Sequence, residues 1–126
     1  METILLVDDD ATVLNLCKRI LMHGGYVVMT AGSGMEALRL VQNSANRIDL
    51  ALLDVIMPGM NGIELANLIR SAHPGIPIVL MTGYGPAEIA RVISDNPFRI
   101  IWKPFRTESL LRMIENALGD STTAIA

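Results

Sequence analysis

The strongest constraint on the fold is the alternation of short apolar runs with longer segments of helical periodicity. Gly, Pro, Asn or Ser stands at almost every change between the two patterns. Runs such as ILLV and IVLM are apolar at every position, which is typical of strands buried on both faces. Alternating strands and helices with right-handed crossovers form a parallel sheet that helices cover on both sides. The sequence therefore predicts a doubly wound α/β fold.

Five strands and five helices are expected along the chain. The strands are predicted at residues 3–7, 26–31, 50–54, 76–82 and 99–103. The helices are predicted from 11 to 23, from 33 to near 46, from 61 to the turn at 73–74, from 86 to the turn at 96–97, and from 107 to 119. Ser33 with Glu36 and Asn61 with Glu64 have the spacing of a capping box. Gly119 is expected to cap the last helix, which divides the chain into a domain of residues 1–119 and a tail or linker of residues 120–126.

The composition excludes several classes of protein. With 126 residues and 51% hydrophobic positions, the chain fits one domain. Ten basic against 13 acidic residues give a net charge of -3, so direct binding of nucleic acid is not expected. The single cysteine, Cys17, forms no internal disulfide, and with His23 and His73 it forms no zinc site. No signal peptide or membrane span is expected, because the apolar runs are far shorter than the roughly 20 residues that a span needs. We therefore expect a cytoplasmic protein.

Polar residues gather at the predicted strand ends. In a doubly wound sheet the ligand site lies beyond the carboxyl ends of the strands, where the strand order reverses. The strands lead there into Asp8, Asp9, Asp54, Thr82 and Lys103. Neighbouring carboxylates favour a divalent cation, and Mg2+ (or Mn2+) suits a few carboxylates completed by water and phosphate oxygens. Asp54 is the candidate nucleophile, because a carboxylate at a strand tip can attack phosphorus and form an aspartyl phosphate.

Four segments, ILLVDDD, LLDVIMPGMNG, VLMTG and IWKPF, follow one another in this order. Together they resemble the receiver domains of bacterial two-component response regulators, of the chemotaxis-regulator type, over essentially the whole chain. The resemblance implies a flavodoxin-like three-layer sandwich with strand order 2-1-3-4-5. It also implies that Asp54 accepts a phosphoryl group from a phosphohistidine on a sensor histidine kinase or a histidine phosphotransfer protein. Such a domain is a signalling module that catalyses only its own phosphorylation and dephosphorylation.

The resemblance also assigns metal ligands. It places Asp9 and Asp54 directly on Mg2+, places Asp8 there mainly through water, and adds the backbone carbonyl of Ile56. Asp10 is expected to be a helix cap instead.

The switch residues follow from the same resemblance. Thr82 resembles the hydroxyl that moves towards the phosphoryl group, and Lys103-Pro104 resembles a cis peptide that turns the lysine towards it. Phosphorylation is then expected to repack the surface of the fourth helix, fifth strand and fifth helix.

Two positions depart from the family pattern or qualify it. The family carries Tyr, Phe or His three residues before the lysine, whereas this chain has Ile100. Trp102 is not expected to replace that ring, because it lies on the opposite side of the strand from Lys103, and it is expected to pack under a flanking helix. Tyr84, two residues after Thr82, could cover the phosphoryl group and slow its hydrolysis, or be an ordinary loop tyrosine.

Other functions are weighed against this one. A haloacid-dehalogenase-like phosphatase would use Asp8 as nucleophile and Asp10 as acid/base, but it leaves Asp54 and MPGMNG unexplained. A flavin or nucleotide carrier would need a phosphate-binding loop where this chain has three aspartates. A receiver that docks without being phosphorylated stays open because of Ile100. Also open are the cognate kinase and signal, an output domain or target, membership of a hybrid kinase, homodimer formation and the lifetime of the phosphorylated form.

Overall fold

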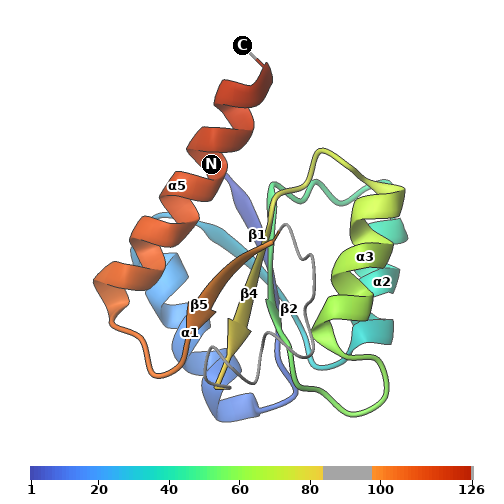
Figure 1. Cartoon of the computed structure of the whole chain (residues 1–126), viewed down its shortest axis with the longest axis horizontal. Coiled ribbons are helices and arrows are strands. Elements are labelled where there is room, and N and C mark those ends of the chain that lie inside the picture. The colour runs from blue at the N-terminus through green and yellow to red at the C-terminus, as the bar shows by residue number, and fades with distance from the viewer. Residues whose placement is uncertain (84–97, 126) are drawn as a thin grey trace.

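A five-stranded parallel sheet forms the centre of the molecule, with helices on both faces (Figure 1). The computed structural model describes residues 1–83 and 98–125. The strands are β1 (Thr3–Val7), β2 (Val27–Ala31), β3 (Leu50–Asp54), β4 (Ile78–Thr82) and β5 (Arg99–Trp102). Neighbouring strands are all parallel and follow the order β2-β1-β3-β4-β5. Both the α/β class and the expected strand order are confirmed.

Four helices lie within the described residues. They are α1 (Ala11–His23), α2 (Gly34–Gln42), α3 (Gly62–Ala72) and α5 (Thr107–Ile125). The helix expected to begin at Pro86 falls outside the described residues, and so does Tyr84. Within residues 1–83 and 98–125, no helix is both long enough and apolar enough to cross a membrane.

Two hydrophobic layers sandwich the sheet. Successive strand residues point to opposite faces, so each inner strand contributes to both layers. Leu5 and Leu53 pack in one layer with buried residues of α2 and α3. Ile4 and Leu52 pack in the other with buried residues of α1 and α5. Figure 1 shows α2 and α3 together on one side of the sheet, and α1 and α5 on the other. Burial on both faces explains why the strands are apolar without interruption.

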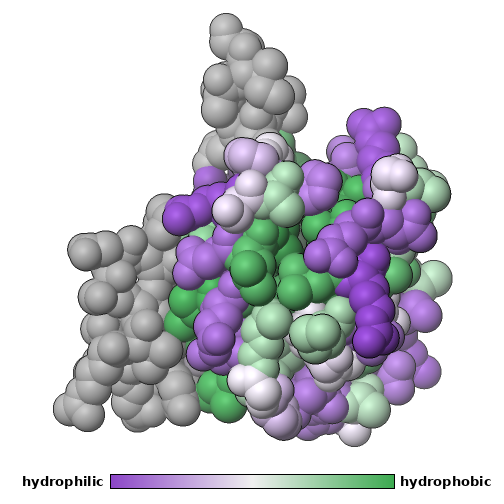
Figure 2. Space-filling model, turned by 90° about the vertical axis from the view of Figure 1, so that its right-hand side faces the viewer, coloured by the Kyte–Doolittle hydropathy of each residue, from purple (hydrophilic) through white to green (hydrophobic). Residues whose placement is uncertain are grey.

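The outer surface of α2 and α3 carries both polar and hydrophobic side chains (Figure 2). Figure 2 looks onto this side of the molecule, where hydrophobic side chains form a band flanked by hydrophilic ones. Met35 on α2 and Leu68 on α3 are the large hydrophobic residues of these helices that are exposed. The inner face of α3 is apolar instead, with Leu65 and Ile69 fully buried. Both helices are thus amphipathic, as their sequence periodicity predicts.

The helix starts follow the predicted caps with one difference. Asn61 and Glu64 form a reciprocal capping box at the start of α3. At α2 the Ser33 hydroxyl accepts the N–H of Glu36, as expected. The Glu36 carboxylate, however, accepts the N–H of Gly32 at 3.0 Å. The predicted capping box of α2 is therefore only half formed, because the carboxylate satisfies the preceding residue instead.

Several element ends differ from the prediction for identifiable reasons. β4 begins at Ile78, two residues late, because Pro77 has no N–H to donate to the ladder. α2 ends at Gln42 and not near residue 46, because Asn43 leaves the helical conformation and its side chain accepts the N–H of Ala45. β2 and β5 are each one residue shorter than expected.

The largest difference is at α5, where Gly119 does not end the helix. α5 continues through Gly119 to Ile125 and extends beyond the sheet (Figure 1). Glycine is a poor helix former but keeps its backbone N–H and C=O, so it interrupts no hydrogen bond of the helix. The predicted C-cap is wrong. The division into residues 1–119 and 120–126 stays a prediction.

Candidate functional site

The fold brings acidic residues together at the carboxyl edge of the sheet. Asp8 follows β1 directly, and Asp54 is the last residue of β3. β1 and β3 are neighbours, and the chain runs from β1 to β2 on one side and then crosses to β3 on the other. The strand order therefore reverses at this pair, which is where doubly wound sheets bind ligands. The two carboxylates lie at the predicted location.

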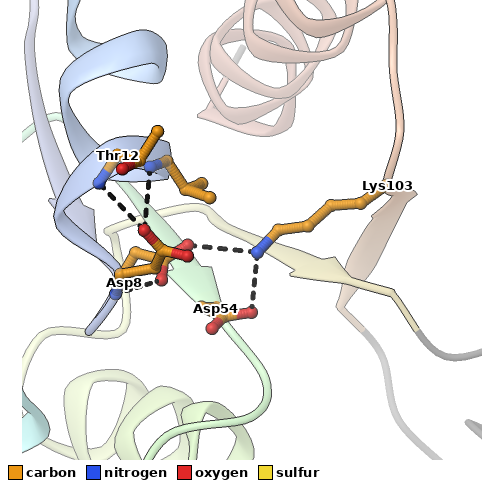
Figure 3. A network of polar contacts seen from close by, with 6 residues as sticks. Asp8, Thr12, Asp54 and Lys103 are labelled. Atoms are coloured by element: carbon orange, nitrogen blue, oxygen red, sulfur yellow. Dashed lines mark hydrogen bonds and ion pairs between the residues drawn. The ribbon is translucent and has the colours of Figure 1, made fainter.

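Lys103 follows the edge strand β5, and its side chain reaches across to these carboxylates (Figure 3). Its Nζ lies 3.1 Å from Oδ2 of Asp8 and 3.3 Å from Oδ1 of Asp54. The residue follows β5, and its backbone N–H donates to the carbonyl of Thr82 at the end of β4. Asp8 is 1% and Asp54 5% exposed, whereas the lysine side chain is 25% exposed. The site is thus a pair of buried carboxylates bridged by one cation.

Asp9 adds a third carboxylate. One oxygen from each of Asp8, Asp9 and Asp54 lies within 4.8 Å of the others, so the cluster could bind a metal ion. The two oxygens of Asp8 already contact protein groups, since Oδ1 accepts the N–H of Asp10 and Oδ2 faces Lys103. Asp9 is exposed. The donor set, carboxylate oxygens only, matches what hard divalent cations bind.

The electrostatics of the cluster are dominated by burial. The pKa of Asp54 is raised from 3.8 to about 6, mainly by burial and next by the neighbouring Asp8 carboxylate, while Lys103 opposes the shift. The pKa of Lys103 is raised as well: burial alone lowers it, but the attraction of Asp54 and Asp8 outweighs burial. A buried carboxyl group whose pKa lies near neutral pH, next to a lysine whose pKa is raised, is typical of a functional site.

Two further expectations are confirmed next to the cluster. Asp10 is the N-cap of α1, and its carboxylate accepts the N–H groups of Thr12 at 2.9 Å and Val13 at 3.4 Å. This engagement does not suit the acid/base role that a phosphatase would require of Asp10. The Lys103-Pro104 peptide bond is cis, as the resemblance implies.

The loop after β3 leads into a residue that sequence analysis did not single out. Gly62, the first residue of α3, donates its N–H to the carbonyl of Val55 at 2.9 Å. A Cβ at this position would lie 2.8 Å from the carbonyl carbon of Asp54 and would overlap its carbonyl oxygen. The only sequence signal was the last glycine of MPGMNG. Ile56 lies in the same loop and is exposed.

Ile100 and Trp102 occupy one face of β5. Their ladder partners are Leu80 and Thr82, and residues two apart in a strand point the same way. Sequence analysis excluded Trp102 as a replacement for the family's aromatic ring because it lies on the opposite side of the strand from Lys103. Ile100, at the position of that ring, lies on the same side as Trp102, so this reason does not exclude Trp102. Ile100 packs against the layer that contains α2 and α3. Trp102 is 39% exposed.

Comparison with known proteins decides the family. The family model described as the response regulator receiver domain matches residues 4–115. The chain belongs to this family. Receiver domains act in two-component phosphorelay signalling, and the predicted family and function are confirmed at this level.

Relatives and solved structures of receiver domains agree with this assignment. The chain is 34% identical over 117 residues to the sensor kinase CckA of Brucella abortus and 35% identical over 123 residues to the transcriptional regulatory protein GlrR of Escherichia coli. These alignments cover 92% and 96% of the chain, but only 12% and 27% of the relatives. The receiver therefore spans a small part of these longer proteins. A receiver domain protein (CheY-like) from Methanospirillum hungatei superposes with a TM-score of 0.88, 31% identity and 98% coverage of both chains.

Proposed function

We propose that this receiver domain accepts a phosphoryl group on the carboxylate of Asp54, from a phosphohistidine of a sensor histidine kinase or a histidine phosphotransfer protein. The observation that carries the proposal is the buried Asp54 at the strand-order reversal, 3.3 Å from Lys103 and beside Asp8 and Asp9. A partner of this class is supported by the similarity to a segment of a sensor kinase.

The transfer follows from the chemistry of the acceptor. A carboxylate oxygen of Asp54 attacks phosphorus, the new O–P bond forms, and the P–N bond to the donor imidazole breaks with its electron pair on nitrogen. The departing imidazole takes up a proton. A pKa of about 6 leaves Asp54 ionised, and thus nucleophilic, at neutral pH. Burial means that few water molecules have to leave the carboxylate before attack.

Lys103 and the acidic cluster stabilise the transferred group. The ammonium of Lys103 already contacts Asp54 and is placed to neutralise a phosphoryl oxygen. Asp9 and Asp54 would hold Mg2+ directly, with Asp8 acting through water and the carbonyl of Ile56 completing the site. When bound, Mg2+ offsets the charge of the carboxylates and of the phosphoryl oxygens. The indirect role of Asp8 is supported by the contacts that both of its oxygens make within the protein.

Output is proposed to begin at Thr82. This residue is buried at the end of β4, and its carbonyl accepts the backbone N–H of Lys103. A phosphoryl group adds up to about two negative charges to Asp54, which attract the Thr82 hydroxyl. Movement of Thr82 then shifts the population of conformations at β5 and α5. Pro104 and Ile100 are proposed to modulate this step, and Tyr84 is proposed to slow hydrolysis of the phosphoryl group.

The proposal is tested by intact mass after incubation with Mg2+ and acetyl phosphate. The wild type is expected to gain one phosphoryl group that hydroxylamine removes, as an acyl phosphate requires. The Asp54→Asn variant is expected to gain none. Asp49→Asn is the matched control, because Asp49 immediately precedes β3 at the end far from Asp54, where its carboxylate accepts the N–H of Thr3.

Two results would contradict the proposal. Phosphate that persists on Asp54→Asn would move the acceptor elsewhere, with Asp8 as the first residue to replace. A wild type that takes up no phosphate from acetyl phosphate, nor from a panel of purified phosphorylated sensor kinases, would favour a receiver that docks without phosphorylation. Ile100 in place of the family's aromatic residue is the sequence feature that motivates this second candidate.

A further inference from the structure

The first turn of α3 rests on the backbone of the proposed acceptor. A Cβ on Gly62 would lie 2.8 Å from the carbonyl carbon of Asp54 and 2.9 Å from Cα of Val55, and would overlap the Asp54 carbonyl oxygen. Real Cβ atoms essentially never approach other atoms within 3.0 Å. The obstructing atoms belong to backbone, so no change of rotamer can remove the clash. Only a hydrogen atom fits at this point.

Other close glycines of the described residues meet movable side chains instead. A Cβ on Gly24 would meet Cδ2 of Leu111 at 2.6 Å, and one on Gly34 would meet Sδ of Met60 at 2.8 Å. Leucine and methionine can change rotamer. A Cβ on Gly75 would meet nothing within 4 Å. Gly62 is therefore distinguished by what it touches, which is the main chain of the acceptor.

The glycine is required for space and not for conformation. Gly25 and Gly59 have positive φ angles, whereas Gly62 is an ordinary helical residue. Its place is fixed from both sides. Its N–H donates to Val55, and the preceding Asn61 caps α3 by accepting the N–H groups of Ile63 and Glu64, each at 2.9 Å. A side chain at position 62 would have to displace either this capped turn or the end of β3.

We propose that Gly62 is a positioning residue for phosphoryl transfer. Its missing side chain lets α3 hold the backbone of Asp54 where the carboxylate faces Lys103 at 3.3 Å and shares the cluster with Asp8 and Asp9. This inference rests on the proposed role of Asp54 as acceptor. Displacing a reacting group by about 1 Å can reduce a rate by about 10²-fold.

The test compares glycine-to-alanine variants in the rate of phosphorylation by acetyl phosphate, divided by the folded fraction from circular dichroism. Gly62→Ala is expected to be about 10²-fold slower than wild type. The rate should stay low at saturating Mg2+ and donor, because the acceptor itself is displaced. Gly24→Ala is the matched control for stability, since it creates a clash at the C-terminal end of α1, away from the site. Gly75→Ala controls for the substitution itself. Both controls are expected to keep the wild-type rate per folded molecule.

A purely structural role predicts a different result. Gly62→Ala would then lose stability but keep the wild-type rate per folded molecule, and the inference would be overturned. If Gly62→Ala does not fold, the phosphorylation rate of Asn61→Ala is the test. This variant keeps the glycine and removes only the side-chain cap that holds the first turn of α3 in place. A reduced rate in Asn61→Ala supports the inference, and an unchanged rate overturns it. A wild type that takes up no phosphate contradicts the proposed function, and this inference with it.

Discussion

Asp54 combines burial, charge and a like-charged neighbour, and its raised pKa is the result. In the native state the pKa is about 6, against 3.8 for an unperturbed carboxyl group. The native state therefore binds more protons than the unfolded state between these two values. Stability falls as the pH rises through this window, and above it the ionised carboxylate opposes folding. The proposed acceptor is thus maintained at the expense of stability.

Replacing Asp54 by asparagine is expected to stabilise the metal-free protein at neutral pH. Asparagine keeps the shape of the side chain without the buried charge, and Lys103 retains its pair with Asp8. At about pH 7.5 the free energy of unfolding should rise by roughly 1–3 kcal/mol. The difference should shrink towards zero at about pH 4, where the wild-type carboxyl group is protonated. Urea unfolding in EDTA across this range measures it, and a difference that stays constant with pH would contradict the raised pKa.

Replacing Lys103 by methionine is expected to have the opposite effect. Asp8 and Asp54 would then be buried side by side without a counter-charge. Loss of one partner of a largely buried ion pair costs about 3 kcal/mol, and the loss here should decrease at low pH as Asp54 is protonated. Urea unfolding at about pH 7.5 and about pH 4.5 provides the comparison. Lys18→Met, the same change at an exposed position of α1, should leave stability nearly unchanged.

At the scale of single residues, the sequence predicts the placement of the charged site residues better than it predicts the role of the glycines. Asp8, Asp54 and Lys103 were found because carboxyl ends of parallel strands meet at one edge, a rule that needs only strand positions. The close approach of Gly62 to Asp54 could not be found, because it depends on how two backbone segments pack in three dimensions. The shared face of Ile100 and Trp102 could have been found from strand alternation alone.

The helices show where local sequence rules hold and where they fail. The start of α3 follows its capping box, since Asn61 and Glu64 satisfy each other's backbone groups. The end of α5 does not follow its glycine, because Gly119 stays in helical conformation and the helix continues to Ile125. A glycine after an apolar stripe predicts a helix end only when the chain turns there. Whether it turns is decided by the residues that follow.

The continuation of α5 through Gly119 makes a simple prediction. A Cβ on Gly119 would meet nothing within 4 Å, so Gly119→Ala should raise the free energy of unfolding by about 0.5–1 kcal/mol through helix propensity. Thermal unfolding followed by circular dichroism measures the change. Gly59→Ala is the control, because the φ of 74° at this position disfavours alanine and the variant should lose stability. If Gly119→Ala also loses stability, the helix ends at residue 119.

At the scale of the whole molecule, the sheet couples the site to folding. Both hydrophobic layers share the strands that carry Asp8 and Asp54 at their ends. The fold class and the strand order could be predicted because uninterrupted apolar strands alternating with helices allow few topologies. The ion pairs of Lys103 could not be predicted as contacts, since they join residues that are 95 and 49 positions apart in the sequence.

Mg2+ is expected to stabilise the folded protein as a whole. The carboxylate cluster is assembled only when β1 and β3 are paired, so a cation that binds it favours the native state. At about 100 times its dissociation constant a ligand adds about 2.7 kcal/mol of stability, which should appear as a higher melting temperature. Asp9→Asn, a change at an exposed residue that is proposed to bind the metal, should reduce the effect.

The control for this experiment is NaCl at matched ionic strength, which screens the repulsion among the carboxylates without binding them specifically. Equal increases of the melting temperature in MgCl2 and NaCl would show that screening, and not binding, stabilises the cluster.

The position of Trp102 gives the molecule a built-in optical reporter. It is the only tryptophan of the chain, its ladder partner is Thr82, and the residue is 39% exposed to solvent. Indole emission responds to changes in solvent contact, so any rearrangement at the end of β4 should change the intrinsic fluorescence. The kinetics of switching can therefore be followed in the unlabelled protein, with the probe one strand away from the threonine that is proposed to move.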